Sequence, residues 1–193
     1  KVSKPKEPRG RVRFLSEGER EKLLVACKQS NAPYLYPLVV LALSTGARRG
    51  ELLGLTWGDI DLKRKVAILH KTKNEERRAL PLAGHALDCV EKLAEIRRID
   101  TNLLFPDETG KKPVEIRPAW ERVLKESKIE DFKFHDLRHS AASYLAMSGA
   151  SLAEIAEVLG HKTLQMVKRY THISQQHTAG VVSRMNKKIF GGG

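Results

Sequence analysis

The stretch FHDLRHSAASYLAMSGASLAEIAEVLGHKTLQMVKRYTHIS, residues 134–174, carries the patterns that decide the organisation of this chain. Its middle part, SLAEIAEVLGHKTLQMVKRY, has two helical patterns separated by a glycine, and two interpretations fit it. The first is a helix-turn-helix that reads a groove of DNA. The second is a scaffold that delivers His161 and Tyr170 to a chemical site. His135 and Arg138, in the first half of the stretch, bear on that choice.

The composition favours a polyanionic partner. The chain has 193 residues, enough for one domain with a sizeable core, and Lys and Arg outnumber Asp and Glu by 35 to 23. A net charge of +12 indicates nucleic acid as the most plausible partner. A basic protein with no such partner is the alternative, because net charge reports on partners and not on fold.

The cysteines and the apolar runs bear on the compartment. Cys27 and Cys89 each lie in an apolar helical pattern, which predicts two buried thiols and no disulfide framework. Residues 1–13 are basic but lack the apolar run of a signal peptide. The longest apolar run, YLYPLVVLALS, is about half a membrane span. We therefore expect a reducing, cytoplasmic location and no membrane partner.

Hydrophobic periodicity predicts a mainly α fold with a small antiparallel β-sheet. Ser16 and Glu19 form a capping box at the start of the first helix, and Gly46 ends a second helix that is apolar nearly all round. Two strands, VAILH and RRALPL, flank a polar hairpin tip. Helices are further expected over 48–55, 84–98, 116–127, 134–149 and 151–160, and a last one over TLQMVKRYTH, residues 163–172.

Three segments follow from this pattern. Residues 1–13 hold six basic residues, one acidic residue, two prolines and a glycine, which predicts a basic interdomain linker or arm. Residues 14–175 form the expected domain. Residues 176–193 form a tail in which Val181, Val182, Met185 and Ile189 recur at helical spacing, as in a helix that docks on a partner.

The segment HDLRH places His135 and Arg138 three residues apart, on one face of a helix. This pair suits a functional cleft, although a solvated helix end with ordinary charges fits the same spacing. His139 lies four residues after His135, a spacing that can bind zinc. No third ligand is evident in the sequence, so we predict no metal site.

Two upstream segments offer further cations. In LSTGARRGELLGLTW, Arg48 follows the glycine that ends the apolar helix, where a rigid guanidinium suits bidentate binding of a phosphate, and Glu51 is near enough to orient it. Surface arginines at a helix cap are the alternative. Lys71 and Lys73 lie on the hairpin tip, where they either reach into a cleft or form a solvated charge cluster.

Taken in order, TGARRGE, TKNEERRALPL, HDLRH, LGH and RYTH resemble the motifs of the tyrosine recombinase (phage integrase) family. The resemblance covers about residues 14–175 and implies the family's catalytic domain, a mostly α fold with a small sheet. Each motif is weak alone, but five in the right order with plausible spacings are specific.

The resemblance implies a role for each matching residue. Arg48 and Arg138 match the two phosphate-binding arginines, and Glu51 matches the acidic residue that supports the first. His135 matches the family's histidine and is the candidate proton acceptor for the tyrosine, with His139 in support. His161 matches a position that is held by His or Trp. Tyr170 matches the nucleophile, and Lys73, with Lys71 as the alternative, matches the hairpin lysine. The catalytic residues implied are Arg48, Lys73, His135, Arg138, His161 and Tyr170.

These roles imply strand cleavage of double-stranded DNA through a 3′-phosphotyrosine, resealed by a 5′-hydroxyl, without metal or cofactor. The same resemblance implies a homotetramer on DNA and a monomer when isolated. It also implies a bacterial cell or a phage-infected host as the location, in association with the nucleoid. Two alternatives stay open: a helix-turn-helix regulator without chemistry, and a topoisomerase or resolvase that uses the same phosphotyrosine chemistry.

Overall fold

The computed structural model describes residues 13–70, 77–171, 182–183 and 185–191. The described part is mainly helical with one small sheet, as the sequence predicts. Its α-helices are α1 (Glu17–Gln29), α2 (Leu35–Thr45), α3 (Arg49–Leu53), α4 (His85–Glu95), α5 (Arg117–Glu126), α6 (Asp136–Met147) and α7 (Leu152–Leu159). Short 3-10 helices are η1 (Trp57–Asp59), η2 (Leu164–Met166) and η3 (Lys168–Tyr170).

The sheet has the strand order β1-β2-β3, with β1 (Ile60–Asp61), β2 (Val66–Leu69) and β3 (Arg78–Pro81) all antiparallel. The predicted hairpin is confirmed as β2 and β3, and its register pairs Val66 with Pro81 and Leu69 with Arg78. Pro81 is tolerated because β3 is an edge strand with one side free of ladder bonds. The strand β1 was not predicted, because two residues are too few to show alternation.

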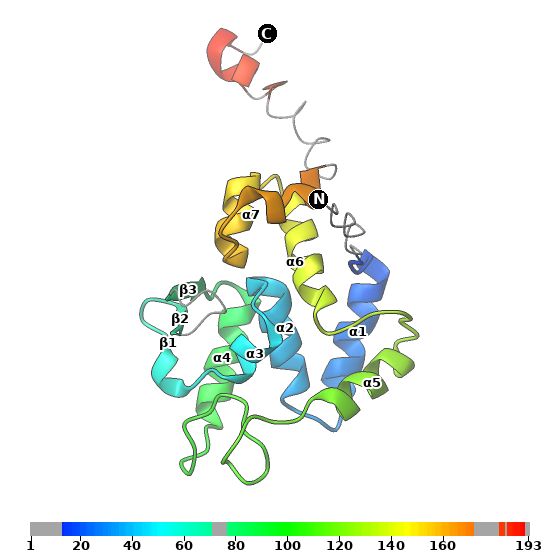
Figure 1. Cartoon of the computed structure of the whole chain (residues 1–193), viewed down its shortest axis with the longest axis vertical. Helices are drawn as coiled ribbons and strands as arrows, with labels where there is room; N and C mark the ends of the chain where they lie inside the picture. The colour runs from blue at the N-terminus through cyan, green and yellow to red at the C-terminus, as the bar shows by residue number, and fades with distance from the viewer. Residues whose placement is uncertain (1–12, 71–76, 172–181, 184, 192–193) are drawn as a thin grey trace, which may run out of the picture.

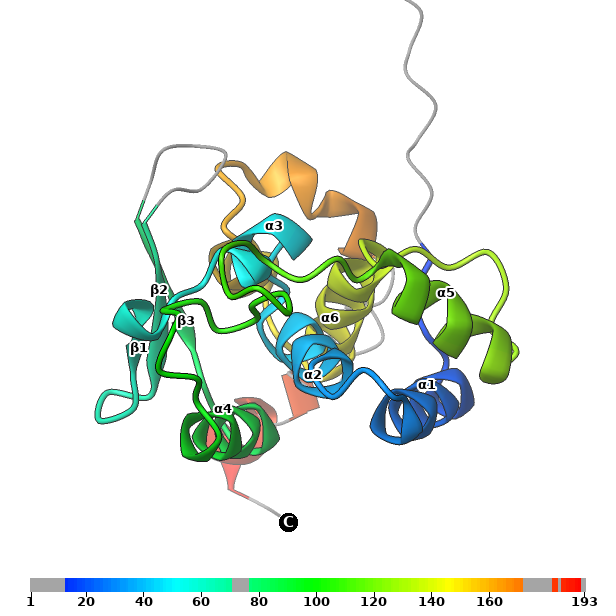
Figure 2. The ribbon, with the colours of Figure 1, turned by 90° about the horizontal axis from the view of Figure 1, so that it is seen from below.

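The helices are arranged around α2. Figures 1 and 2 show the sheet and α4 on one side of α2, α1 and α5 on the other, and α6 running from this body into an upper layer with α7. The helix α2 is buried nearly all round, and Leu35, Leu38 and Leu41 are at most 1% exposed. Each such side chain contributes about 1.5–3 kcal/mol by leaving water, so α2 anchors the fold.

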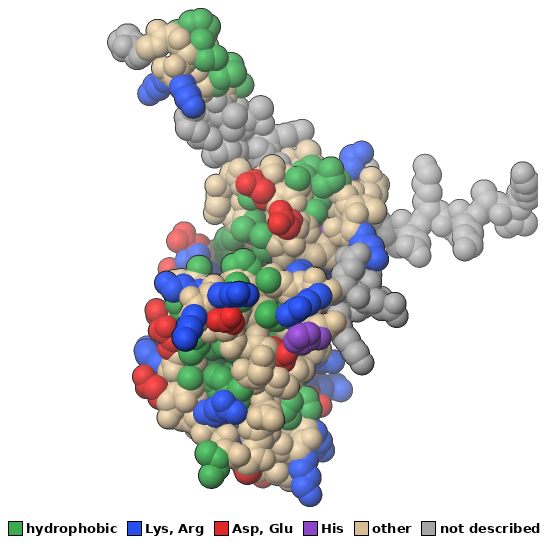
Figure 3. All heavy atoms as spheres, turned by 90° about the vertical axis from the view of Figure 1, so that its left-hand side faces the viewer, with side chains coloured by type: hydrophobic (Ala, Val, Ile, Leu, Met, Phe, Trp, Pro, Cys, Tyr) green, Lys and Arg blue, Asp and Glu red, His purple; other side chains and the backbone are tan. Residues whose placement is uncertain are grey.

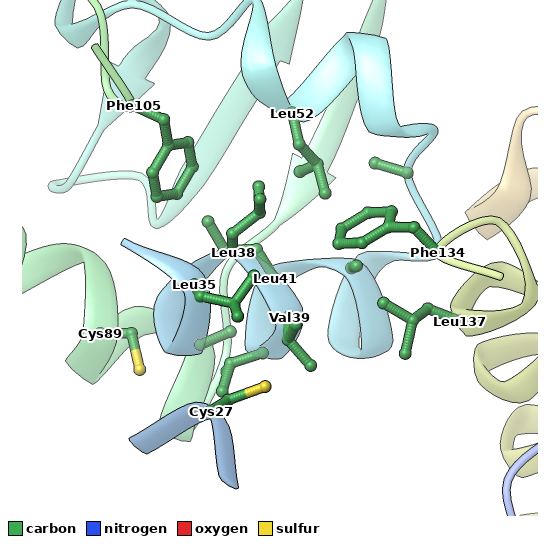
Figure 4. Packing of buried hydrophobic residues seen from close by; sticks show 14 of the residues in the cluster. Cys27, Leu35, Leu38, Val39, Leu41, Leu52, Cys89, Phe105, Phe134 and Leu137 are labelled. Carbon is green, nitrogen blue, oxygen red and sulfur yellow. The ribbon is translucent and has the colours of Figure 1, made fainter. Parts of the chain in front are cut away.

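Two separate clusters of buried residues result. The larger, here called the main core, runs from Leu15 to Leu137 and gathers around α2, where Figure 4 shows Leu38 and Leu41 close to Leu52 and Phe134. The smaller, here called the C-terminal core, joins α6, α7 and η3. Its buried members are Ala142, Ala146, Ile155, Ala156, Leu159, Val167 and Tyr170.

Local sequence signals explain most helix ends. The capping box at the start of α1 is confirmed, since Ser16 Oγ accepts from the Glu19 amide at 3.3 Å and Glu19 Oε2 accepts from the Ser16 amide at 2.8 Å. Gly46 ends α2 in the left-handed conformation with φ 61°, as glycine allows. The two predicted buried thiols, Cys27 and Cys89, are free and buried.

The prediction of one continuous helix over residues 163–172 is wrong for the described residues of this segment. The chain there forms η2 and η3, two 3-10 turns on either side of Val167. A 3-10 helix has three residues per turn, so positions three apart lie on one side. Val167 and Tyr170 are thereby both buried, at 0% and 1% exposure, while Lys168 and Arg169 between them are exposed. A helix-turn-helix needs a continuous second helix here, so its strongest support is lost.

The ends of the chain fall mostly outside the described residues. The predicted arm lies outside them except for Arg13, which pairs with Glu19 of α1 and donates to the Phe14 carbonyl at 2.6 Å. Within the tail, residues 182–183 and 185–190 are helical, and Val182, Met185 and Ile189 are 48–61% exposed. Of the described helices, none is long and apolar enough to cross a bilayer.

Candidate active site

The first arginine of the predicted site is held by a carboxylate one helical turn away. Arg48 stands at the N-cap of α3, and Glu51 Oε2 accepts from its backbone amide at 2.8 Å. Glu51 Oε1 accepts from Arg48 Nη1 at 2.7 Å. The carboxylate is 6% exposed and the Arg48 side chain 24% exposed. One buried carboxylate therefore fixes both the backbone and the guanidinium of Arg48, as expected from their spacing.

The turn before Arg48 approaches α7 closely. A Cβ atom on Gly46 would lie 2.4 Å from Leu159 Cδ2 of α7. Any larger residue would therefore have to displace the buried Leu159 side chain, in addition to the strain of its positive φ. Glycine at position 46 both ends α2 and lets the C-terminal core pack on the main core.

The second arginine lies between these two segments. Arg138 of α6 is 5% exposed, and its Nη1 and Nη2 donate to the carbonyls of Gly46 at 2.6 Å and Leu159 at 2.7 Å. Burial and the neighbouring Arg48 and Arg78 guanidinium groups lower its pKa to about 10, so Arg138 stays charged at neutral pH. Arg138 therefore brings a rigid, poorly hydrated cation close to Arg48.

A third arginine, Arg78, was not singled out by the sequence analysis. Its Nη2 donates to Glu51 Oε2 at 3.1 Å and its Nη1 to the Val158 carbonyl at 2.9 Å. The signal that could have found it is strand alternation: Arg78 shares a face with Leu80 and Leu82, which are both buried. A cation on the buried face of a strand needs a partner, and Glu51 is that partner.

His161 follows the left-handed Gly160 that ends α7. Its backbone amide donates to the Ala156 carbonyl at 2.8 Å, and its Nδ1 is buried without a hydrogen-bond partner among the described residues. Burial, together with the charges of Arg138 and Arg48, lowers the pKa of His161 to about 4. The imidazole is therefore neutral at pH 7 and lies in the field of both arginines.

Tyr170 is buried, and within the described part of the chain its hydroxyl has one hydrogen-bond partner. The residue is 1% exposed, and its Oη lies 2.6 Å from Nδ1 of His139. Burial raises the pKa of Tyr170 above its usual value, against the lowering effect of Arg169 and Arg138. Burial and the nearby His135 lower the pKa of His139 to about 4. A protonated phenol thus faces a neutral imidazole.

His135 stands at the exposed N-terminal end of α6, and its ring meets that of His139 edge to face, with centroids 5.5 Å apart. Burial of its ring atoms and the charge of Arg138 lower the pKa of His135. Among the described residues, Tyr170 forms its hydrogen bond with His139, and none is found between Tyr170 and His135. The two histidines therefore differ in position: one touches the phenol, and the other faces outward.

The structure brings together seven of the eight predicted residues. The eighth, Lys73, lies outside the described residues, as does its alternative Lys71. Within the described ranges, no group of three or more His, Cys, Asp or Glu side chains is arranged to hold a metal ion. Figure 3 shows Lys and Arg side chains across the middle of the face on the sheet side, interspersed with acidic ones.

Chemically, the arrangement offers several cations and a phenol. Two guanidinium groups can donate to the non-bridging oxygens of a phosphodiester, and such donors stabilise the charge that develops during phosphoryl transfer. A buried tyrosine with an imidazole at its hydroxyl has the geometry of a nucleophile beside a proton acceptor.

Comparison with known proteins gives the class. The sequence model of the phage integrase family matches residues 13–177. Integrase of Salmonella phage P22 is 32% identical over 189 residues, which cover 92% of this chain and 47% of that protein. The shufflon-specific DNA recombinase of Escherichia coli is 36% identical over 173 residues, covering 89% of this chain and 43% of the recombinase.

The catalytic domain of bacteriophage HP1 integrase has the same fold, with a TM-score of 0.71 and 26% identity over 93% of this chain and 98% of that domain. The chain belongs to the phage integrase family of tyrosine recombinases. This confirms the resemblance drawn from the five motifs. The chain spans about half the length of the curated relatives it matches.

Proposed function

We propose that this chain is the catalytic domain of a site-specific DNA recombinase or integrase, in which Tyr170 attacks a DNA phosphodiester. The observation that carries the proposal is the 2.6 Å approach of the Tyr170 hydroxyl to His139, near Arg138, whose charge in turn interacts with that of Arg48. The kinship with an integrase and a DNA recombinase supports the same reaction and DNA as the substrate.

The nucleophile must lose a proton as it attacks. A free phenol has a pKa of about 10 and is almost wholly protonated at pH 7, and burial raises the pKa of Tyr170 further. The neutral His139 imidazole, with its own proton on Nε2, can accept the phenolic proton at Nδ1. We therefore assign proton acceptance to His139, whose imidazole contacts the Tyr170 hydroxyl, in place of the expected His135. We assign contact with the phosphate to His135, at the exposed start of α6.

The bond changes balance without an external energy source. The Tyr170 oxygen bonds to phosphorus, the bond from phosphorus to the 5′-oxygen breaks, and the leaving oxygen takes a proton, which we assign to Lys73 of the hairpin. Arg48 and Arg138 bind the non-bridging oxygens, and the neutral His161 donates a further hydrogen bond. Attack by a second 5′-hydroxyl reverses these steps and joins a new strand, because the 3′-phosphotyrosine conserves the bond energy.

The arrangement of partners follows from exchange between strands. Strand exchange needs more than one cleaving tyrosine, so we propose a homotetramer on double-stranded DNA and a monomer when isolated. The exposed apolar residues Val182, Met185 and Ile189 of the tail suit docking on a neighbouring protomer. With cellular DNA as the substrate, the protein acts in the cytoplasm, at the nucleoid.

A nicked duplex tests the proposal. Cleavage of such a substrate releases a short strand that diffuses away, so the covalent intermediate accumulates and is seen on a denaturing gel. Wild-type protein should form this adduct, and Tyr170→Phe should form none while binding the same duplex with nearly unchanged affinity. The ring of phenylalanine keeps the C-terminal core filled, so the lost adduct reports on the hydroxyl alone. An adduct of normal yield with Tyr170→Phe would refute the assignment.

A further inference from the structure

The side chain of Arg78 contacts two elements besides its own strand. From the start of β3 it donates to Glu51 of α3 at 3.1 Å and to the Val158 carbonyl, near the end of α7, at 2.9 Å. Glu51 supports Arg48, and Val158 lies three residues before His161, next to Leu159 at the end of α7. Arg78 therefore lies between two parts of the proposed site that belong to different layers of the fold.

The contact with Glu51 fixes the orientation of a shared carboxylate. Glu51 Oε2 accepts from both the Arg48 amide and Arg78 Nη2, and Oε1 accepts from Arg48 Nη1. Without Arg78, Glu51 Oε2 would keep only the Arg48 amide as a donor, and the carboxylate would be freer to rotate. Because Arg48 takes its position from that carboxylate, its guanidinium would be held less firmly.

The contact of Arg78 with α7 is close and largely shielded from solvent. The Arg78 side chain is 13% exposed, and a Cβ atom on Gly160 would lie 2.6 Å from its Nη1. Arg78 and Arg138 donate to successive carbonyls, those of Val158 and Leu159. The C-terminal end of α7 is thus held by two arginines from separate elements, directly before His161.

We propose that Arg78 is a positioning residue that aligns Arg48, through Glu51, with His161, through the end of α7. This inference rests on the proposed function. Arg78 contacts no reacting atom in this account, so its loss should slow the chemical step and leave DNA affinity nearly unchanged. Small misplacements of groups around a reacting phosphate are costly, up to about 100-fold for a shift of about 1 Å.

The test compares Arg78→Met and Arg78→Lys with Arg77→Ala. Like Arg78→Met, Arg77→Ala removes one positive charge, but it does so at the exposed neighbouring position. The rate of adduct formation on a nicked duplex is measured at saturating protein, the Kd is measured separately, and thermal unfolding confirms the fold. We expect both Arg78 variants to slow the adduct by about 10- to 100-fold. Arg77→Ala should change that rate less than twofold. Lysine should rescue poorly, because a point charge cannot reach Glu51 and Val158 together.

A double-mutant cycle separates positioning from general loss of structure. If Arg78 acts through Glu51, the effects of Arg78→Lys and Glu51→Gln on the adduct rate should be clearly less than additive. Additive effects, or Arg78→Lys at the wild-type rate, would overturn the inference. If Arg78→Met fails to fold, Arg78→Lys, which keeps the charge and the buried stem, decides the outcome. A wild-type protein that forms no adduct would overturn the proposed function as well. If the wild-type protein forms the adduct and the Arg78 variants form it at the same rate, only this inference is overturned.

Discussion

The main core and the C-terminal core differ in size and in the groups they carry. The main core has 31 buried residues in the described chain, and the elements around it present Arg48, Glu51 and Arg78. The C-terminal core has seven, and the elements around it present His161 and Tyr170. Helix α6 belongs to both and carries Arg138 and His139.

Tyr170 is the only aromatic residue among the seven of the C-terminal core, so the proposed nucleophile is also its largest packing element. Regions with few buried contacts open at lower free energy than the body they rest on. We therefore expect Arg48 and the nucleophile to stand on layers of unequal stability. On this ground we expect Tyr170 to move more readily than Arg48 relative to a bound phosphate.

The largest effect is expected from removing one buried side chain from each core in turn. Leu38 and Ile155 are both 0% exposed. Leu38→Ala should lower the free energy of unfolding of the whole domain by about 2–5 kcal/mol. Ile155→Ala should mainly reduce the hydrogen-exchange protection of α7, with less loss in denaturant titrations. Equal loss of protection in α2 and α7 with Ile155→Ala would show that the two cores unfold as one.

Arg48 and Arg138 should differ in their effect on stability, because only Arg138 bonds to residues of both layers. Arg48→Ala and Arg138→Ala should each slow adduct formation, because each should raise the activation free energy by about 3 kcal/mol. Arg138→Ala should also destabilise the C-terminal core, since Arg138 donates to Gly46 and Leu159 across the boundary. Lysine at either position should restore little activity, because it lacks the planar fork. Wild-type rates in both lysine variants would argue against a phosphate clamp.

A smaller effect concerns pH. The pKa values of His139 and His161 are both lowered from 6.5 to about 4. Between these values the unfolded chain binds protons that the folded chain excludes, so stability should fall as the pH drops from about 6.5 to about 4. After allowance for partial exposure, the loss should be on the order of 2 kcal/mol. Denaturation of His139→Gln combined with His161→Asn should show a flatter pH dependence, and an unchanged slope would place the titration elsewhere.

The sequence predicted the features that depend on neighbours along the chain. The capping box of Ser16 and Glu19, the stop at Gly46 and the support of Arg48 by Glu51 each span at most one helical turn, and all three are observed. Helix and strand bounds agree with the predictions to within about one turn, except in the segment after α7.

The features it missed depend on contacts between distant segments. In the 3-10 turns η2 and η3, Val167 and Tyr170 both pack into the C-terminal core against residues of α6 and α7. The pairing of Tyr170 with His139 joins residues 31 positions apart, and that of Arg78 with Val158 joins residues 80 apart. Local patterns contain no information on such pairs, apart from the strand alternation that places Arg78 on a buried face.

Whether Tyr170 is the nucleophile is tested most directly by locating the covalent bond between protein and DNA. The adduct formed on a nicked duplex is digested with nuclease and trypsin, and mass spectrometry identifies the peptide that carries a nucleotide. The account predicts a single modified residue, Tyr170, bonded to the 3′-phosphate of the cleaved strand, with a free 5′-hydroxyl on the released fragment. A nucleotide on any other residue, or a bond to a 5′-phosphate, would contradict it.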